Sequence, residues 1–113
     1  MLQQFEFFDV AGLAWEPAGD GVQQRVLSRS PDGVTLTRIT RWRAGLDTSA
    51  TGVIRHEFHE QVLILEGDLT DLTLARTFGP GHYASRRPGM PHGPYRTTSG
   101  CTMFEIRTFG TTP

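Results

Sequence analysis

Glycine and proline interrupt this chain so often that a long helix cannot form. Of its 113 residues, 13 are glycine and 7 are proline, and both residue types favour turns over the interiors of helices. The runs between them are short and rich in Val, Ile, Leu, Thr and Phe, and none keeps the apolar spacing of a helix. Short strands about 8–12 residues apart, with turns between them, are typical of a sandwich or barrel. A parallel βαβ arrangement is excluded, because no segment is long enough to serve as a crossover helix.

The expected strands lie between clear turn signals. Ser30-Pro31-Asp32-Gly33 and Gly79-Pro80-Gly81 are two such turns, because proline and glycine supply the backbone angles that turns require. The runs that we predict to be strands are Gln23–Ser30, Val34–Arg43, Val53–Phe58, Gln61–Glu66, Leu69–Phe78, His82–Arg87 and Thr102–Phe109.

One all-β domain is expected to cover residues 1–113, with an N-terminal arm over residues 1–20 and a barrel over residues 21–110. The arm carries Phe5, Phe7 and Phe8, which are too many aromatic side chains for a free, solvated segment. We expect it to pack on the barrel or on a partner subunit. A small barrel also has edge strands that need cover, so the sequence favours a homodimer.

Composition excludes several classes of function. A net charge of −1 and a pI near 6.4 argue against a nucleic-acid partner, which requires a surplus of basic residues. No apolar run approaches the roughly 20 residues that span a bilayer, and we expect no membrane partner. All 11 basic residues are arginine, which excludes Schiff-base chemistry on lysine. The single cysteine, Cys101, and the lack of positive charge before the first apolar residues favour the cytoplasm.

The four histidines lie in two stretches that each begin with a glycine. Gly52–Gly67 contains His56 and His59, and Gly81–Arg96 contains His82 and His92. Imidazole and carboxylate side chains that converge in a barrel mouth suit Fe(II), Mn, Ni or Zn.

These stretches resemble the two motifs of the cupin superfamily. The usual first motif reads Gly-x5-His-x-His-x(3,4)-Glu-x6-Gly, and the spacing of His56, Glu60 and Gly67 matches its last three positions. The usual second motif reads Gly-x5-Pro-x-Gly-x2-His-x3-Asn. The residues that match it are Gly81, Gly89 and His92, whereas Arg87 and Arg96 stand where that motif has proline and asparagine.

The resemblance implies a double-stranded β-helix, the jelly-roll barrel of cupins. Among cupins, the sequence most resembles small single-domain members, namely the cupin domain of zinc anti-sigma factors and acetylacetone-dioxygenase-like proteins. It also implies a divalent metal, Fe(II), Zn, Mn or Ni, bound by His56, Glu60 and His92. The first histidine of the usual pair falls on Ile54, which cannot bind metal, so His59 is the one nearby residue that could add an imidazole. Strict strand alternation from His56 would turn His59 outward.

The function that this resemblance implies is a metal-dependent, dioxygenase-like oxidoreductase acting on a small organic molecule. A non-catalytic cupin that binds or senses a metal or small ligand is the alternative, and the missing histidine favours it. Isomerase or lyase chemistry is also found among cupins, and fold alone does not select between them.

Residues outside the metal set could also contribute to the site. Glu105 alternates with Cys101 and Met103 on one face of the last run, and a buried glutamate needs a partner. An arginine such as Arg38 or Arg96 could pair with it in the pocket, and an exposed or structural pair is the alternative. Tyr83 and Tyr95 flank the second motif and could offer hydroxyls to a ligand. The catalytic candidates are therefore Glu60, Glu105 and Tyr95. His82 is expected at the surface, and Cys101 in the core.

Overall fold

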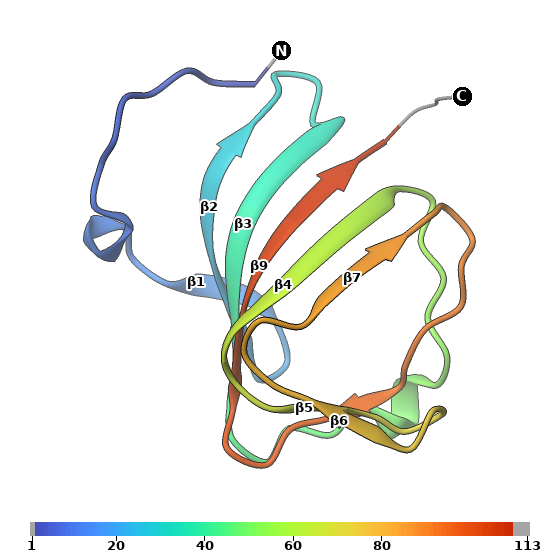
Figure 1. Ribbon diagram of the computed structural model, residues 1–113. Coiled ribbons are helices and arrows are strands. Elements are labelled where there is room, and N and C mark those ends of the chain that lie inside the picture. Colours follow the sequence, from blue (N-terminus) through green and yellow to red (C-terminus); the bar gives the residue numbers. More distant parts are fainter. Residues whose placement is uncertain (1, 110–113) are drawn as a thin grey trace.

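The computed structural model describes residues 2–109, which form two antiparallel sheets that face each other (Figure 1). Two 3₁₀ turns, η1 (Val10–Gly12) and η2 (Ser49–Thr51), are the helical elements of this range. The six-stranded sheet has the order β1 (Glu16–Gly19), β2 (Val22–Arg29), β3 (Thr35–Trp42), β9 (Cys101–Thr108), β4 (His59–Gly67) and β7 (Tyr83–Arg86). The three-stranded sheet has the order β6 (Arg76–Phe78), β5 (Leu69–Asp71) and β8 (Tyr95–Arg96). The expectation of an all-β barrel is confirmed.

Strand β9 lies between β3 and β4, although it is the last strand of the chain. It is antiparallel to both neighbours, with Glu105 opposite Arg38 on one side and opposite Val62 on the other. Segments far apart in sequence therefore supply adjacent side chains on the inner face of the larger sheet. This arrangement positions the charged residues described below.

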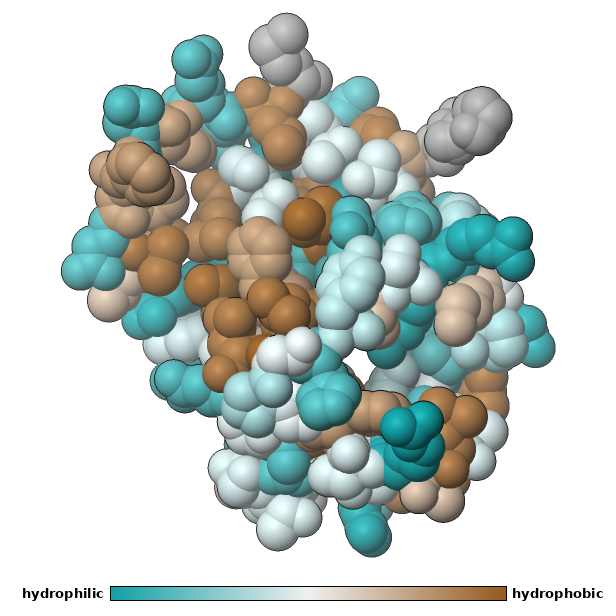
Figure 2. All heavy atoms as spheres, viewed as in Figure 1, coloured by the Kyte–Doolittle hydropathy of each residue, from teal (hydrophilic) through white to brown (hydrophobic). Residues whose placement is uncertain are grey.

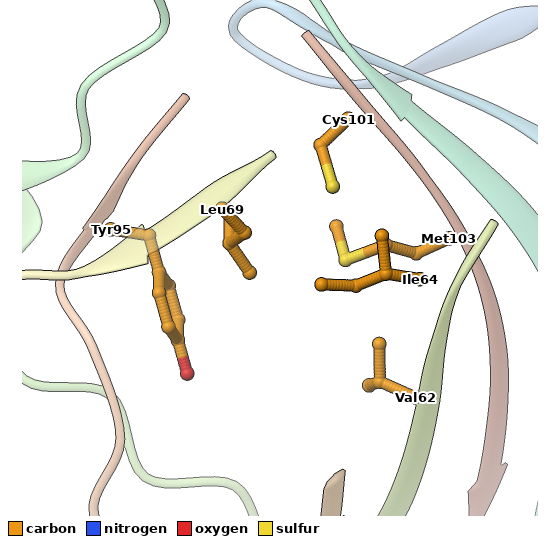
Figure 3. Packing of buried hydrophobic residues seen from close by; sticks show 6 residues of the cluster. All are labelled: Val62, Ile64, Leu69, Tyr95, Cys101 and Met103. Atoms are coloured by element: carbon orange, nitrogen blue, oxygen red, sulfur yellow. The ribbon is translucent and has the colours of Figure 1, made fainter. Parts of the chain in front are cut away.

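The hydrophobic core joins the two sheets. Figure 3 shows six of its side chains, from β4, β5, β8 and β9, pointing toward one another. They are Val62, Ile64, Leu69, Tyr95, Cys101 and Met103. Cys101 is buried as expected, and burial raises the pKa of its thiol to about 12. Because the thiolate is the nucleophilic form, Cys101 acts as a core residue.

Gly67 ends β4 where the chain passes close to another loop. Its φ of 86° is in the left-handed region, and a Cβ atom there would overlap the backbone carbonyl of Gly100. Glycine is therefore required at the final position of the first motif.

Two predicted strands were wrong. Val53–Phe58 contains bends and makes one isolated bridge, between Ile54 and His92, because no strand runs alongside the rest of it. Leu69–Phe78 is a hairpin of β5 and β6. The Asp71 side chain ends β5, since its Oδ1 accepts hydrogen bonds from the backbone N–H groups of Thr73 and Leu74, a local turn that competes with a continuous strand.

The N-terminal segment runs beside its own sheet. Strand β1 pairs with β2, and the backbone N–H of Gln3 reaches the carbonyl of Arg29 at 3.4 Å. Figure 2 shows hydrophobic side chains gathered on this side of the molecule, over the arm and the first strands. Phe5, Phe7 and Phe8 remain exposed. The expected end of the barrel at residue 110 lies outside the described residues. Within residues 2–109 there is no helix of the length and apolarity needed to cross a membrane.

Candidate metal centre

His56, Glu60 and His92 converge at one end of the inner face. One potential ligand atom from each lies within 4.8 Å of the others. His56 belongs to the segment before β4, and Glu60 is the second residue of β4. His92 follows the Pro88–Pro91 turn, and the bridge between Ile54 and His92 brings the two segments together.

His92 has one nitrogen engaged and one nitrogen free. Its Nδ1 lies 3.0 Å from the Tyr95 hydroxyl. Its Nε2 is buried and has no hydrogen-bond partner among the described residues. Burial, with the nearby Arg86, lowers the pKa of His92 to about 4. The imidazole is therefore neutral at pH 7, which is the state that binds a metal.

His56 completes the pair of imidazoles. Its ring lies 4.9 Å from that of His92, measured between centroids, and stacks on Phe58 at 4.3 Å. Burial lowers the pKa of His56 as well. A buried nitrogen without a partner, a second neutral imidazole and a carboxylate form a donor set that fits a divalent transition metal.

Glu60 is buried and held by two arginines. Its Oε1 accepts a hydrogen bond from Arg86 Nη1 at 2.9 Å, and its Oε2 lies 3.4 Å from Arg107 Nε. His56 Nε2 lies 4.0 Å from Oε1. Burial of a carboxylate is costly unless it is paired, and the two guanidinium groups compensate for it here.

A line of alternating charges continues from Glu60 across four strands, and we call it the charged row. Arg38 on β3 donates to Glu105 Oε1 from Nε at 3.1 Å and from Nη2 at 2.9 Å. Arg107 links the two acids, because its Nη2 lies 3.8 Å from Glu105 Oε1. The members of the charged row are Arg38, Glu105, Arg107, Glu60 and Arg86.

An apolar cavity of about 350 Å³ adjoins the centre. Figure 2 shows the molecule hollowed between the two sheets. Side chains such as Leu69, Phe78 and Met90 line most of its wall, and His92, Arg86 and Tyr95 lie along it. A small organic molecule in this space would lie beside the imidazole of His92.

His59 and Tyr83 were expected as possible site residues and lie apart from the cluster, and so does His82, which was expected at the surface. His59 Nε2 is 3.2 Å from Ser85 Oγ, on the outer side of β4. His82 is exposed, with Nδ1 2.9 Å from the carbonyl of Gly79. Tyr83 donates its hydroxyl to Gln61 Oε1 at 2.7 Å.

Glu105 is buried, and of its two expected partners Arg38 pairs with it and Arg96 does not. Thr40 Oγ1 donates to its second oxygen at 2.6 Å, so Glu105 is engaged within the sheet. Sequence reasoning missed Arg86 and Arg107 as partners of Glu60. The alternation of the last run places Arg107 on the same face as Glu105, but it does not identify Glu60 as a partner. Nothing in the local sequence distinguishes Arg86 from Arg87.

The sequence model described as the ChrR cupin-like domain matches residues 3–108. This chain belongs to the ChrR cupin-like family. A search of curated protein sequences finds no match, so the family rests on the domain match. The cupin resemblance seen in the two histidine motifs is thereby confirmed.

Solved structures of low sequence identity share the fold. An RmlC-like cupin from Shewanella frigidimarina has a TM-score of 0.74 and 14% identity, covering 96% of this chain and 94% of that one. An acetylacetone dioxygenase from Acinetobacter johnsonii has a TM-score of 0.70 and 14% identity, covering 94% and 74%. The anti-sigma factor ChrR in complex with SigE, from Rhodobacter sphaeroides, has a TM-score of 0.65 and 22% identity. That match covers 88% of this chain but 51% of the other, so this chain spans about half the length of that protein chain.

Proposed function

We propose that this family member binds a divalent metal and a small, largely apolar organic molecule beside it, and that it acts as a dioxygenase-like oxidoreductase. The observation that supports this proposal is the convergence of His56, Glu60 and His92 beside an apolar cavity of about 350 Å³. Two histidines and one carboxylate with open positions are the arrangement of many non-heme Fe(II) oxygenases. Zinc, manganese and nickel also accept this donor set.

The metal, when bound, would supply open positions at which substrate and dioxygen can bind together. The side chains around the centre would orient the ligands and exclude water. Tyr95 orients the ring of His92 through Nδ1, as a second-layer partner does for a metal-binding histidine. Arg86 and Arg107 hold Glu60 in place, and Glu105 positions Arg107 in turn. The apolar wall excludes water from the bound molecule.

A non-catalytic role in sensing a metal or small ligand is the second candidate. Two observations favour it. Ile54 stands where the usual motif has histidine, and the Glu60 carboxylate is already engaged by two arginines. A centre with fewer available ligands can hold a metal or an organic molecule without turnover.

Metal analysis tests the shared part of both proposals. Purified protein should contain about one transition-metal ion per chain, and His92→Ala should abolish binding because the buried Nε2 is lost. His82→Ala and His59→Ala are the matched controls, and both should retain the metal, since neither imidazole lies in the cluster. Metal-free wild-type protein after reconstitution would contradict the oxidoreductase and the metal-sensing role.

Oxygen consumption separates the two candidates. The iron-loaded protein should consume dioxygen in the presence of diketones or catechol-like compounds if it is an oxidoreductase. Stoichiometric metal without oxygen uptake on any of these compounds would favour the sensing role.

A homodimer in the cytoplasm completes the proposal. The exposed aromatic side chains of the N-terminal arm support a second copy as its partner, and closed twofold dimers are the commonest soluble homo-oligomers. The single, buried cysteine supports a compartment that keeps thiols reduced.

A further inference from the structure

Tyr95 lies at the junction of the core, the metal centre and the cavity. Its ring is buried and packs edge-on against Trp42, with 6.1 Å between centroids. Figure 3 shows the ring opposite Ile64 and Val62, with the hydroxyl at the end away from Cys101. The residue also borders the cavity. Its hydroxyl is therefore a polar group at the inner end of an apolar space.

The Tyr95 oxygen has two nitrogen atoms within hydrogen-bond distance. Arg86 Nη2 donates at 2.8 Å, and an arginine is always a donor. His92 Nδ1 lies at 3.0 Å, and its role depends on the tautomer. If His92 Nε2 binds a metal, the proton of the ring is on Nδ1, which then donates to Tyr95. The opposite tautomer would leave an N–H on the buried Nε2 without an acceptor.

The hydrogen of the Tyr95 hydroxyl is then left without a protein partner. Its oxygen accepts from Arg86 and His92, and residues 2–109 give the hydroxyl no other hydrogen-bond partner. We propose that this hydrogen points into the cavity and binds the oxygen of a carbonyl-bearing ligand. The inference rests on the proposed function, because the bound metal selects the tautomer. It narrows the ligand class to small apolar ketones and related carbonyl compounds.

Three other polar side chains of the cavity wall are less suited to this role. The Tyr83 hydroxyl already donates its hydrogen bond to Gln61. Asp71 is an acceptor, and its Oδ1 is taken up by two backbone N–H groups. Arg86 already binds Glu60 and Tyr95. The hydrophobic side chains around them, including Leu69, Phe78 and Met90, suit the apolar body of the ligand.

Two probes of nearly equal shape test this assignment. Acetophenone carries a carbonyl, and α-methylstyrene has a methylene group in its place. Binding to the zinc-loaded full-length protein, which avoids turnover, is measured by NMR titration. Wild type should bind acetophenone roughly five- to tenfold more tightly, the size of one hydrogen bond. Tyr95→Phe should remove this preference and leave α-methylstyrene unaffected. Tyr83→Phe, the matched control on the same cavity, should keep it.

The zinc content of every sample distinguishes a failure of the proposed function from a failure of the role assigned to Tyr95. Protein without zinc overturns the proposed function, and the tautomer argument with it. Protein with zinc that shows no preference for acetophenone, or keeps the preference in Tyr95→Phe, overturns the role of Tyr95 alone. If Tyr95→Phe loses both probes, the wild-type spectrum decides. The Tyr95 hydroxyl proton should shift downfield with acetophenone only, and an unchanged proton overturns the assignment.

Discussion

Ile54 lies directly opposite His92 and leaves the centre one imidazole short of the usual cupin set. The two residues exchange both backbone hydrogen bonds, at 2.8 Å and 3.0 Å. Side chains paired in this way lie on the same face, with Cβ atoms about 5 Å apart. The position of the missing ligand is therefore preserved in the backbone, and the side chain alone has changed.

Replacing Ile54 with histidine should restore a third imidazole. We expect Ile54→His to tighten zinc binding by at least the roughly tenfold that even outer-shell partners contribute, because the new ring would lie beside His92. Competition with a coloured chelator measures the affinity. Val53→His is the control, since Val53 is the adjacent residue and is 51% exposed. Equal affinities for the two variants would contradict the assigned geometry.

At the scale of the element, β3 presents one arginine inward and another outward. Arg38 is buried against Glu105, whereas Arg41 is exposed, bonds Gln23 and lies over the Trp15 ring. Loss of one partner of a buried ion pair leaves an uncompensated charge. The two faces of the same strand should therefore respond very differently to loss of an arginine.

Arg38→Met should lower the free energy of unfolding by about 3–5 kcal/mol. Arg41→Met, the control on the same strand, should cost no more than about 1 kcal/mol. Urea unfolding followed by tryptophan fluorescence gives both values. Similar losses for the two variants would show that the charged row does not stabilise the sheet.

Most strands and the two-residue alternation of Cys101–Arg107 could be predicted from sequence, because both are local patterns. The pairing of Glu60 with Arg86 and Arg107 could not, because it depends on β9 and β7 flanking β4. Val53–Phe58 has the composition of a strand and lacks a neighbouring strand to pair with along its length. Spacing within the motifs predicted His56, Glu60 and His92 correctly as neighbours, since the family resemblance supplied the long-range contact.

At the scale of the whole molecule, the N-terminal arm leaves aromatic side chains on the surface. Phe5 and Phe8 pack against each other at 5.5 Å between centroids, and Phe7 is fully exposed. Contiguous exposed apolar side chains mark interaction sites. The arm contacts its own sheet near Arg29, so a second copy would cover the outer surface of the arm.

We expect the intact chain to be a dimer whose mass is twice 12.6 kDa. Phe7→Ser should raise the dimer dissociation constant at least roughly tenfold, because a large buried aromatic side chain would be lost from the interface. Light scattering coupled to gel filtration measures the mass. Leu74→Ser, which changes an exposed leucine on the β5–β6 turn, should leave the dimer intact. A monomer at tens of micromolar wild-type protein would refute the idea.

The charged row also limits how this sequence can change over generations. Its five members alternate in sign, and each acid lies between two arginines. Substituting one member leaves a buried charge without its full set of partners, which destabilises the fold. Replacing several members together with apolar side chains can leave the stability unchanged or even raise it. A path of single substitutions from the charged row to an apolar inner face therefore passes through unstable intermediates. A protein lineage that has acquired the charged row therefore keeps it, because its single mutants are unstable, even if a wholly apolar inner face would be equally stable.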